Sequence, residues 1–274
     1  MILVVASNKD SASLNIKKQL LIHYRFDGTE ERFQENTTYV SQINGKDVQL
    51  ITLNQESIYA QDLTTFFKEP ELIVFISRHS SMSGTPTLSV HTPGNLGPAE
   101  LGGNPREVSV SPANAMRDAL KAMVKMREEM QLKYEVSYEG THHGPSLNAP
   151  TMFVELGSSP EQWKDAAAAE AVARATMEAV SRFRSVLAET VLGMGGPHYN
   201  SKFTRIALEK EVAFGHMIPK HSVSQIDAGM LQQCIRRTSE KVVRTVLDWK
   251  GIKGDDKPRV IEMLNKTGLP IQKA

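Results

Sequence analysis

Two adjacent histidines lie in a turn-rich stretch near the middle of the chain, EGTHHGPSLNAPTMFVELG. His142 and His143 stand between glycines and prolines, and the short apolar segment that follows carries Glu155. Imidazole nitrogens and carboxylate oxygens are both zinc ligands, and both groups can transfer protons during catalysis. The stretch therefore indicates metal binding or acid–base chemistry, provided that other parts of the chain supply partners.

Other histidines also follow segments that we expect to be strands. The order along the chain is His79 after residues 72–76, His142 and His143 after residues 134–138, and His198 after residues 190–194. In open α/β sheets, ligands bind at the carboxyl ends of the strands. If these three strands are parallel, the four imidazoles converge on one crevice from distant positions in the sequence.

Four clustered imidazoles with Glu139 or Glu155 nearby would form a zinc site without thiolates. Zinc lowers the pKa of a bound water towards about 7, and a neighbouring carboxylate or histidine can carry its proton, which is the chemistry of hydrolysis. The spacing matches no zinc signature, since His-Glu-x-x-His is absent. Adjacent histidines on an extended backbone point apart, so a hydrogen-bonded structural role for each is the alternative. A serine triad also stays open, because several serines adjoin His79.

Other catalytic motifs are absent from the sequence. There is no Gly-x-Ser-x-Gly elbow and no Gly-x-x-x-x-Gly-Lys-Ser/Thr phosphate loop. The glycine-rich runs at 93–98 and 101–105 lack the helix of a nucleotide fingerprint, so we expect turns or a flexible rim to the crevice. The single cysteine, Cys234, excludes an intramolecular disulfide and a cysteine zinc cluster, and we expect it to pack on a helix face.

Strand and helix signals alternate along the chain, which favours an α/β fold. We expect strands at residues 1–6, 48–53, 72–76, 134–138, 152–156 and 190–194, and helices from Ser11 or Ser13, from Ser111–Pro112 and over residues 162–187. The length of 274 residues suits a single catalytic domain over 1–274. No run approaches the roughly 18 apolar residues that cross a bilayer, and a signal-peptide pattern is missing. We therefore expect a cytoplasmic protein, and a monomer.

The C-terminal part of the chain is basic. Residues 235–274 carry ten basic and five acidic residues, although the net charge of the whole chain is only +1. We expect a helix over 226–249 within a basic helical C-terminal segment, 226–274. Arg237, Lys241 and Arg244 then form one stripe of that helix, which could follow a phosphate backbone; a solvated face is the alternative.

Four motifs occur in sequence: SRHSSMSGTPTLSVHTPGN at 77–95, THHGP at 141–145, GGPHY at 195–199 and GHMIPKH at 215–221. Together, and in this order over nearly the whole chain, they resemble the archaeal and plant D-aminoacyl-tRNA deacylases. The opening SNKDSAS at 7–13 departs slightly from the family pattern, with Ser11 where proline is expected.

The resemblance implies hydrolysis of the ester that joins a D-amino acid to the terminal ribose of tRNA, by a zinc-associated cytosolic enzyme. tRNA carrying a D-amino acid is then the expected partner. The resemblance also implies a fold similar to peptidyl-tRNA hydrolase and to phosphorylase/hydrolase-like proteins, with a mixed, mostly parallel sheet flanked by helices.

Chemistry suggests a role for each candidate residue. The expected groups are His79, His142, His143 and His198 for the metal; Glu155, with His216 as second candidate, for proton transfer; Arg78, Asn95, Asn148, Tyr199 and Asn200 for the substrate; and Arg237, Lys241 and Arg244 for tRNA. For the polar residues, loop stabilisation is the alternative. Two other functions stay open: a zinc-dependent peptidase or amidohydrolase that uses the same crevice, and a metal-stabilised RNA-binding module without hydrolytic activity.

Overall fold

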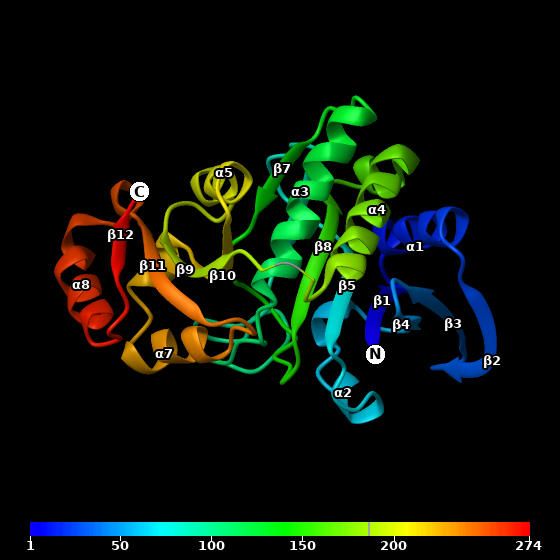
Figure 1. Cartoon of the computed structure of the whole chain (residues 1–274), viewed down its shortest axis with the longest axis horizontal. Helices are drawn as coiled ribbons and strands as arrows, with labels where there is room; N and C mark the ends of the chain where they lie inside the picture. The colour runs from blue at the N-terminus through cyan, green and yellow to red at the C-terminus, as the bar shows by residue number, and fades with distance from the viewer. Residues whose placement is uncertain (186) are drawn as a thin grey trace.

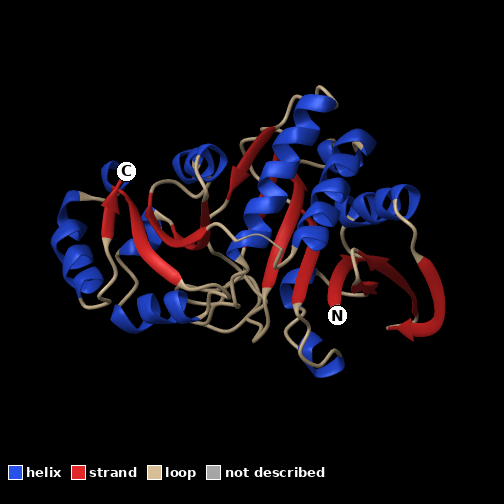
Figure 2. Cartoon of the chain, in the orientation of Figure 1, coloured by secondary structure: helices blue, strands red, loops and turns tan. Residues whose placement is uncertain are grey.

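An eight-stranded sheet forms the larger part of the protein (Figures 1 and 2). The computed structural model describes residues 1–185 and 187–274. The strand order is β2-β3-β4-β1-β5-β8-β6-β7. The strands are β1 (Ile2–Ser7), β2 (Asp27–Phe33), β3 (Asn36–Ile43), β4 (Lys46–Leu53), β5 (Leu72–Arg78), β6 (Thr87–His91), β7 (Glu135–Tyr138) and β8 (Thr151–Gly157).

A smaller four-stranded sheet is built from the C-terminal part of the chain, with the order β10-β9-β11-β12. Its strands are β9 (Glu189–Gly195), β10 (Val212–Ile218), β11 (Val242–Asp248) and β12 (Ile271–Lys273). All pairings in this sheet are parallel, whereas the larger sheet has antiparallel pairings at β2–β3, β3–β4 and β6–β8. The predicted α/β fold with a mixed, mostly parallel sheet flanked by helices is therefore confirmed.

Three helices cover one face of the larger sheet (Figure 1). The helices of the protein are α1 (Ser11–His23), α2 (Leu63–Phe66), α3 (Ala113–Glu129), α4 (Ala166–Arg182), α5 (Ser201–Glu209), α6 (Lys220–Val223), α7 (Ala228–Arg236) and α8 (Lys257–Asn265). Helices α1, α3 and α4 bury Val74 and Val154 of the sheet against Met116 and Val172. The opposite face carries Phe75 and Phe153, whose stacked rings lie 4.7 Å apart.

Carboxylate side chains cap the N-termini of the long helices. Asp10 accepts the backbone N–H of Ser13 in α1, and Asp165 accepts two N–H groups in α4. Helix α3 begins next to Ser111–Pro112 as expected, but its free N–H groups are bound by the Glu240 carboxylate rather than by Ser111. A distant acidic side chain thus replaces the local cap that the sequence suggested.

The predicted helix over 162–187 is shorter than expected. Residues 162–164 form one 3₁₀ turn, and α4 covers Ala166–Arg182. Residue 186, within the predicted range, lies outside the described residues. Most of the alanines of α4, from Ala168 onwards, are buried, and their small side chains allow α3 and α4 to pack closely.

The predicted continuous helix over 226–249 is wrong, and residues 226–274 contain strands β11 and β12 as well as helices α7 and α8. Helix α7 ends at Arg236, and Val242–Asp248 forms β11 between β9 and β12. The β-branched residues of Val-Val-Arg-Thr-Val fit a strand better than a helix, because they pack well on a pleated sheet. Residues 237, 241 and 244 therefore do not form a helical stripe.

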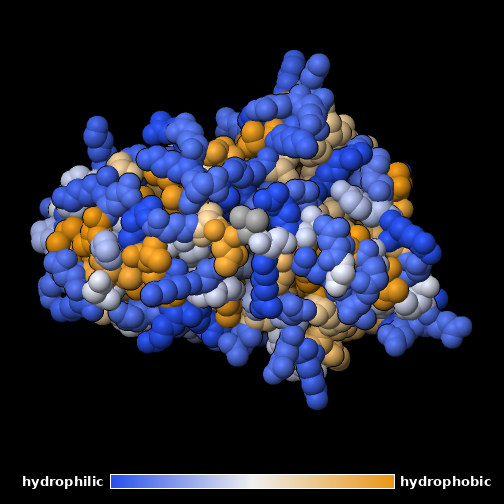
Figure 3. Space-filling view, viewed as in Figure 1, coloured by the Kyte–Doolittle hydropathy of each residue, from blue (hydrophilic) through white to orange (hydrophobic). Residues whose placement is uncertain are grey.

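The face of the molecule seen in Figure 3 is mainly polar. Figure 3 shows hydrophilic residues over most of the visible face, with apolar residues in several separate groups. Within the described residues, the structure contains no helix with the length and apolar character needed to cross a bilayer. The monomeric state stays a prediction.

Candidate metal centre and active site

Glu139 lies at the centre of the histidine cluster. Its carboxylate is completely buried, and it contacts imidazoles from three distant parts of the chain. The distances are 3.2 Å from Oε1 to His79 Nδ1, 3.0 Å from Oε2 to His198 Nε2 and 3.8 Å from Oε2 to His142 Nε2. The predicted convergence of these histidines is confirmed by the geometry.

The expected cause of this convergence, three parallel strands, is wrong. Strand β8 is parallel to β5, but β6 is antiparallel to β8 and β7 is parallel to β6. Strand β7 therefore runs opposite to β5, and β9 belongs to the smaller sheet. The histidines and glutamates of the cluster meet for two reasons. Alternate residues of these strands face the side of the sheet opposite to α1, α3 and α4, and the loops after β7 and β9 lie on that same side.

His91 is a further member of the cluster that we did not select from the sequence. Its ring centroid lies 4.3 Å from that of His142 and 4.9 Å from that of His143. The ring is fully buried and stacked on Phe153, and within the described residues neither of its nitrogens has a hydrogen-bond partner. Because buried polar atoms usually have a partner, these two nitrogens fit a site that holds a metal ion or water.

The adjacent histidines lie on the same side of the backbone, contrary to the usual expectation for neighbours in a strand. His143 has a φ of 40°, in the left-handed region, so the alternation of an extended chain is interrupted. The ring centroids of His142 and His143 are 4.2 Å apart. This local turn brings both imidazoles close to His91.

The ring orientations of His142 and His143 suit metal binding. His142 Nδ1 lies 2.9 Å from the Gly140 carbonyl oxygen, and His143 Nδ1 lies 2.7 Å from that of Gly144. Since a carbonyl only accepts, each Nδ1 donates its hydrogen and each Nε2 keeps its lone pair. Backbone carbonyls orient metal-ligating histidines in the same way.

Among the residues that the structure describes, three groups of side chains have donor atoms within 4.8 Å of one another: His91, His142 and His143; Glu139, His142 and His198; and His79, Glu139 and Glu155. Together they offer nitrogen and oxygen donors. The unpartnered nitrogens of His91 and the oriented rings of its neighbours fit a bound metal ion. His142 belongs to two groups, and so does Glu139.

Burial controls the charge of these histidines. It lowers the pKa of His142 well below the usual value, and the neighbouring imidazoles of His143 and His91 lower that pKa further. Burial also lowers the pKa of His143 to about 4, although the Gly144 carbonyl acts in the opposite direction. Both rings are therefore neutral at physiological pH, which is the form that binds metals.

The two carboxylates beside His79 behave in opposite ways. Burial raises the pKa of Glu155 above its usual value, and the charge of Glu139 adds to this effect, while the His79 contact opposes it. For Glu139, burial is outweighed by hydrogen bonds from His198 and His79, which hold its pKa well below the usual value. A pair of carboxyl groups with separated pKa values can divide acid and base roles.

A family model described as D-aminoacyl-tRNA deacylase matches residues 66–272. The chain belongs to this family. Similar curated proteins named D-aminoacyl-tRNA deacylase include that of Thermococcus kodakarensis, which is 36% identical over 98% of both chains. That of Methanococcus vannielii is 37% identical, over 98% of this chain and 97% of its own. The crystal structure of AF0625, a conserved protein of unknown function, has a TM-score of 0.87 and 30% identity, covering 100% of this chain and 95% of that one.

Tyr199 joins the cluster in this member of the deacylase family. Its hydroxyl lies 3.1 Å from His79 Nε2, and its ring contacts both His79 and His198 edge-on. The side chain is 37% exposed, so it forms part of the boundary between the buried carboxylates and solvent. Among the residues predicted to bind substrate, Tyr199 makes direct contacts with His79 and His198, two of the predicted metal ligands.

The other expected substrate residues make hydrogen bonds that stabilise loops. Arg78 pairs with Glu56 and binds the Lys9 carbonyl, and the Asn95 amide binds the carbonyls of residues 102 and 104. Asn200 caps α5, and Asn148 accepts a bond from the Arg237 side chain. These contacts match the alternative of loop stabilisation. Asn95 also borders the cavity beside His142.

His216, the second candidate for proton transfer, lies behind the loop that carries His142. Its Nδ1 is 3.1 Å from the Thr141 hydroxyl, and its Nε2 is 3.0 Å from the Arg237 carbonyl. Both ring nitrogens therefore have protein partners, and the ring is fully buried. In this position His216 can support the loop after β7.

Replacing His216 with glutamine should weaken the pH dependence of stability. Burial lowers the pKa of His216 to about 4 in the folded protein, and an unfolded histidine has a pKa of about 6.5. Between these values the unfolded chain binds the extra proton, so the free energy of unfolding falls as the pH falls. The full shift corresponds to about 3 kcal/mol. Urea unfolding at pH 7 and pH 4.5 should show that the free energy of unfolding decreases less for the variant than for the wild type. Equal decreases would contradict the lowered pKa of His216.

Proposed function

We propose that this protein hydrolyses the ester bond of D-aminoacyl-tRNA and releases the free D-amino acid and tRNA. One observation carries the proposal: the buried His91, with two unpartnered nitrogens, adjoins the oriented rings of His142 and His143. Full-length similarity to proteins named D-aminoacyl-tRNA deacylase supports the same reaction. A crevice with nitrogen donors and buried carboxylates supplies what ester hydrolysis requires.

Zinc is the metal that we propose for this centre, because imidazole and carboxylate donors both suit it and no thiolate is present. When bound, zinc supplies a Lewis acid and lowers the pKa of water. His79, His142, His143 and His198 are the proposed metal-facing residues. The possible donor groups also contain Glu139 and Glu155, which the sequence offered as carboxylate partners, and His91, which it did not.

Glu155 is the proposed group for proton transfer. In the reaction, a water oxygen forms a bond to the ester carbon, the bond from that carbon to the ribose oxygen breaks, and the ribose oxygen receives a proton. Glu155 Oε2 lies 3.6 Å from His79 Nδ1, and His79 Nε2 contacts the partly exposed Tyr199. The ion-pair contact from Glu155 to His79 and the hydrogen bond between His79 and Tyr199 form a polar route between the buried carboxylate and the surface, along which a proton can be held or moved.

A comparison of D-Tyr-tRNA and L-Tyr-tRNA tests the proposed function. The protein should release tyrosine from the D-ester much faster than from the L-ester, and dialysis against a chelator should abolish this activity until zinc is returned. Absence of turnover with any D-aminoacyl-tRNA would overturn the proposal. Unimpaired hydrolysis after complete metal removal would overturn the role of zinc alone.

The basic residues after α7 are proposed to contact the tRNA backbone, but their surroundings differ. Lys241 is exposed, whereas Arg237 donates to the Leu147 carbonyl and Arg244 pairs with Glu189. Lys241→Glu is therefore the substitution that disturbs the protein structure least. It should raise KM for D-Tyr-tRNA and reduce the slope of log KM against log salt concentration by about 1. Lys68→Glu, which reverses an exposed charge in the loop after α2, is the control. If both variants change KM and its salt dependence equally, Lys241 does not make a specific contact with the tRNA.

A further inference from the structure

A cavity of about 340 Å³ opens beside the histidine cluster. Its lining combines His142 and His143 with the glycine-rich loop at 94–101 and with residues 221–225 before α7. The loop that we expected to be turns or a rim thus borders the crevice. Any group held in this cavity lies next to the two imidazoles that have oriented Nε2 atoms.

The glycine-rich loop is a preformed wall of this cavity. Gly94 has a φ of +154°, and a Cβ atom there would lie 2.4 Å from the Cα of Val108, so the loop runs tightly against the next segment. The Asn95 amide donates to the carbonyls of Gly102 and Asn104 at 2.8 and 3.1 Å. These bonds tie the two ends of the loop together and fix its shape before any ligand arrives.

Gly97 and Gln225 define the width of the cavity at one end. Both residues line it, and a Cβ atom on Gly97 would lie 2.9 Å from Gln225 Oε1. The backbone of Gly97 lies outside the left-handed region, so space rather than backbone strain limits which residue fits there. A larger side chain at position 97 would therefore displace the flexible end of Gln225 and reduce the free volume.

We propose that this cavity holds the amino acid side chain of the aminoacyl ester, and that Gly97 and Gln225 determine which side chains fit. The inference rests on the proposed function, because the ester carbon must lie at the histidines for hydrolysis. A volume near 340 Å³ is at the small end for ligand sites, and it suits one amino acid. The buried Leu96 in the lining, together with a width set by Gly97 and Gln225, favours a bulky side chain such as that of tyrosine.

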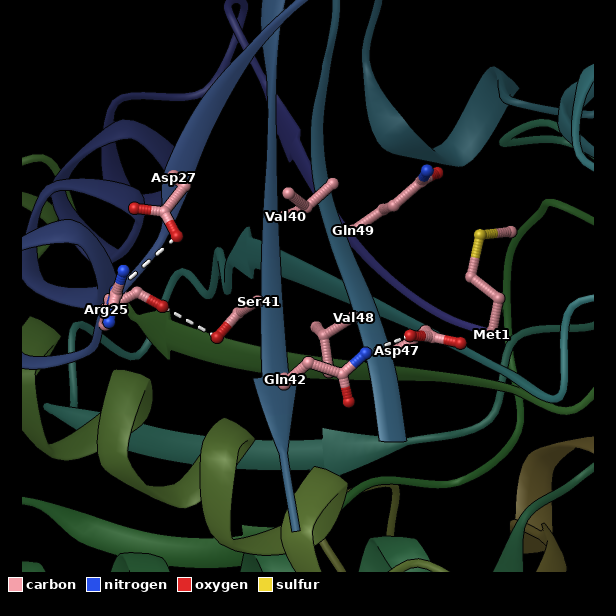
Figure 4. A pocket seen from close by; sticks show the side chains of 9 residues that line it. All are labelled: Met1, Arg25, Asp27, Val40, Ser41, Gln42, Asp47, Val48 and Gln49. Carbon is pink, nitrogen blue, oxygen red and sulfur yellow. Dashed lines mark hydrogen bonds and ion pairs between the residues drawn. The ribbon is translucent and has the colours of Figure 1, made fainter. Parts of the chain in front are cut away.

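A larger cavity, with a volume of about 680 Å³, lies elsewhere, over β3 and β4 (Figure 4). Its polar groups already pair with one another. Arg25 lies 3.5 Å from Asp27, the Ser41 hydroxyl donates to the Arg25 carbonyl, and the Gln42 amide donates to Asp47. No histidine lines it. Although it is larger, this cavity lacks groups that could act on an ester.

The test compares kcat/KM for D-Tyr-tRNA and D-Ala-tRNA in two variants. Gly97→Val should lower the ratio of D-Tyr to D-Ala turnover by about 10-fold or more, because the lost volume excludes the larger side chain. Gln225→Ala should raise the same ratio a few-fold, about as expected for a wider apolar pocket. Gln49→Ala, a matched change in the cavity over β3 and β4, should leave the ratio at the wild-type value.

The outcomes separate this inference from the proposed function. If the wild type releases no D-amino acid from either substrate, the proposed function fails. If the wild type is active but Gln225→Ala leaves the ratio unchanged, the assignment of the cavity is overturned. Gln225→Ala removes only side-chain atoms, so it decides the question even where Gly97→Val does not fold.

Discussion

Replacing Glu155 with glutamine is expected to lower kcat for D-Tyr-tRNA about 10²–10⁴-fold, which is the usual contribution of a positioned acid–base group. Glutamine keeps the shape of the side chain but can neither accept nor release a proton at neutral pH. KM should change little, since Glu155 is buried beneath His79 and does not line the cavity beside His142. Single-turnover measurements with saturating enzyme isolate the chemical step.

The pH profile provides a second readout for Glu155. Burial and the nearby Glu139 charge raise the pKa of Glu155, so its ionised fraction increases as the pH rises through the neutral range. If the ionised form takes the proton from water, the wild-type kcat rises with pH, and the variant profile is flatter. Glu135→Gln, an exposed glutamate on β7, serves as the control. A Glu155 variant with a wild-type rate and profile would exclude proton transfer by this residue.

The sequence predicted that the histidines meet, but for an incorrect reason. His79 and His198 do follow strands, and their loops do approach the loop of His142. The direction of each strand, however, depends on pairings between distant segments, and a single sequence does not reveal them. Strand β6 runs antiparallel to β8, and β7 runs parallel to β6, so the assumption that the histidine-bearing strands are all parallel was incorrect.

The sequence alone gave little reason to select His91 as a ligand. It stands at the end of a five-residue strand, β6, that we did not predict. Strand β6 pairs in parallel with β7, and the register of Val90 with Tyr138 places His91 next to Glu139. His91 lies in the motif at 77–95 and Glu139 lies next to the motif at 141–145, and this was the only hint in the sequence. The strand register is what shows that the two residues are neighbours.

The error over the basic stripe has a different physical cause. Spacing of three and four residues gives a helical face only if the segment is helical, and Arg237, Lys241 and Arg244 span the end of α7 and the start of β11. In β11, Val242, Thr245 and Val246 are buried in a sheet. Tertiary burial of β-branched residues thus outweighed the charge pattern.

His142 belongs to two of the three possible donor groups, so we expect its substitution to have a large effect on metal binding. His142→Ala should lower zinc affinity about 100-fold or more, because even changes of outer partners reduce metal affinity by about 10–100-fold. The substitution removes one donor from two of the three groups, including the one that contains the unpartnered His91. Loss of the ion should reduce hydrolysis of D-Tyr-tRNA to a similar extent. Zinc content after dialysis and activity at increasing zinc concentrations measure both effects.

His23→Ala is the matched control, since His23 lies at the exposed end of α1 and belongs to none of the three donor groups. It should retain the zinc content and activity of the wild type. His142→Ala with full zinc content and normal turnover would show that its ring is structural, held by the Gly140 carbonyl alone. Restored activity at high zinc would instead identify lost affinity as the cause, because weakened binding is reversed by mass action whereas a damaged fold is not.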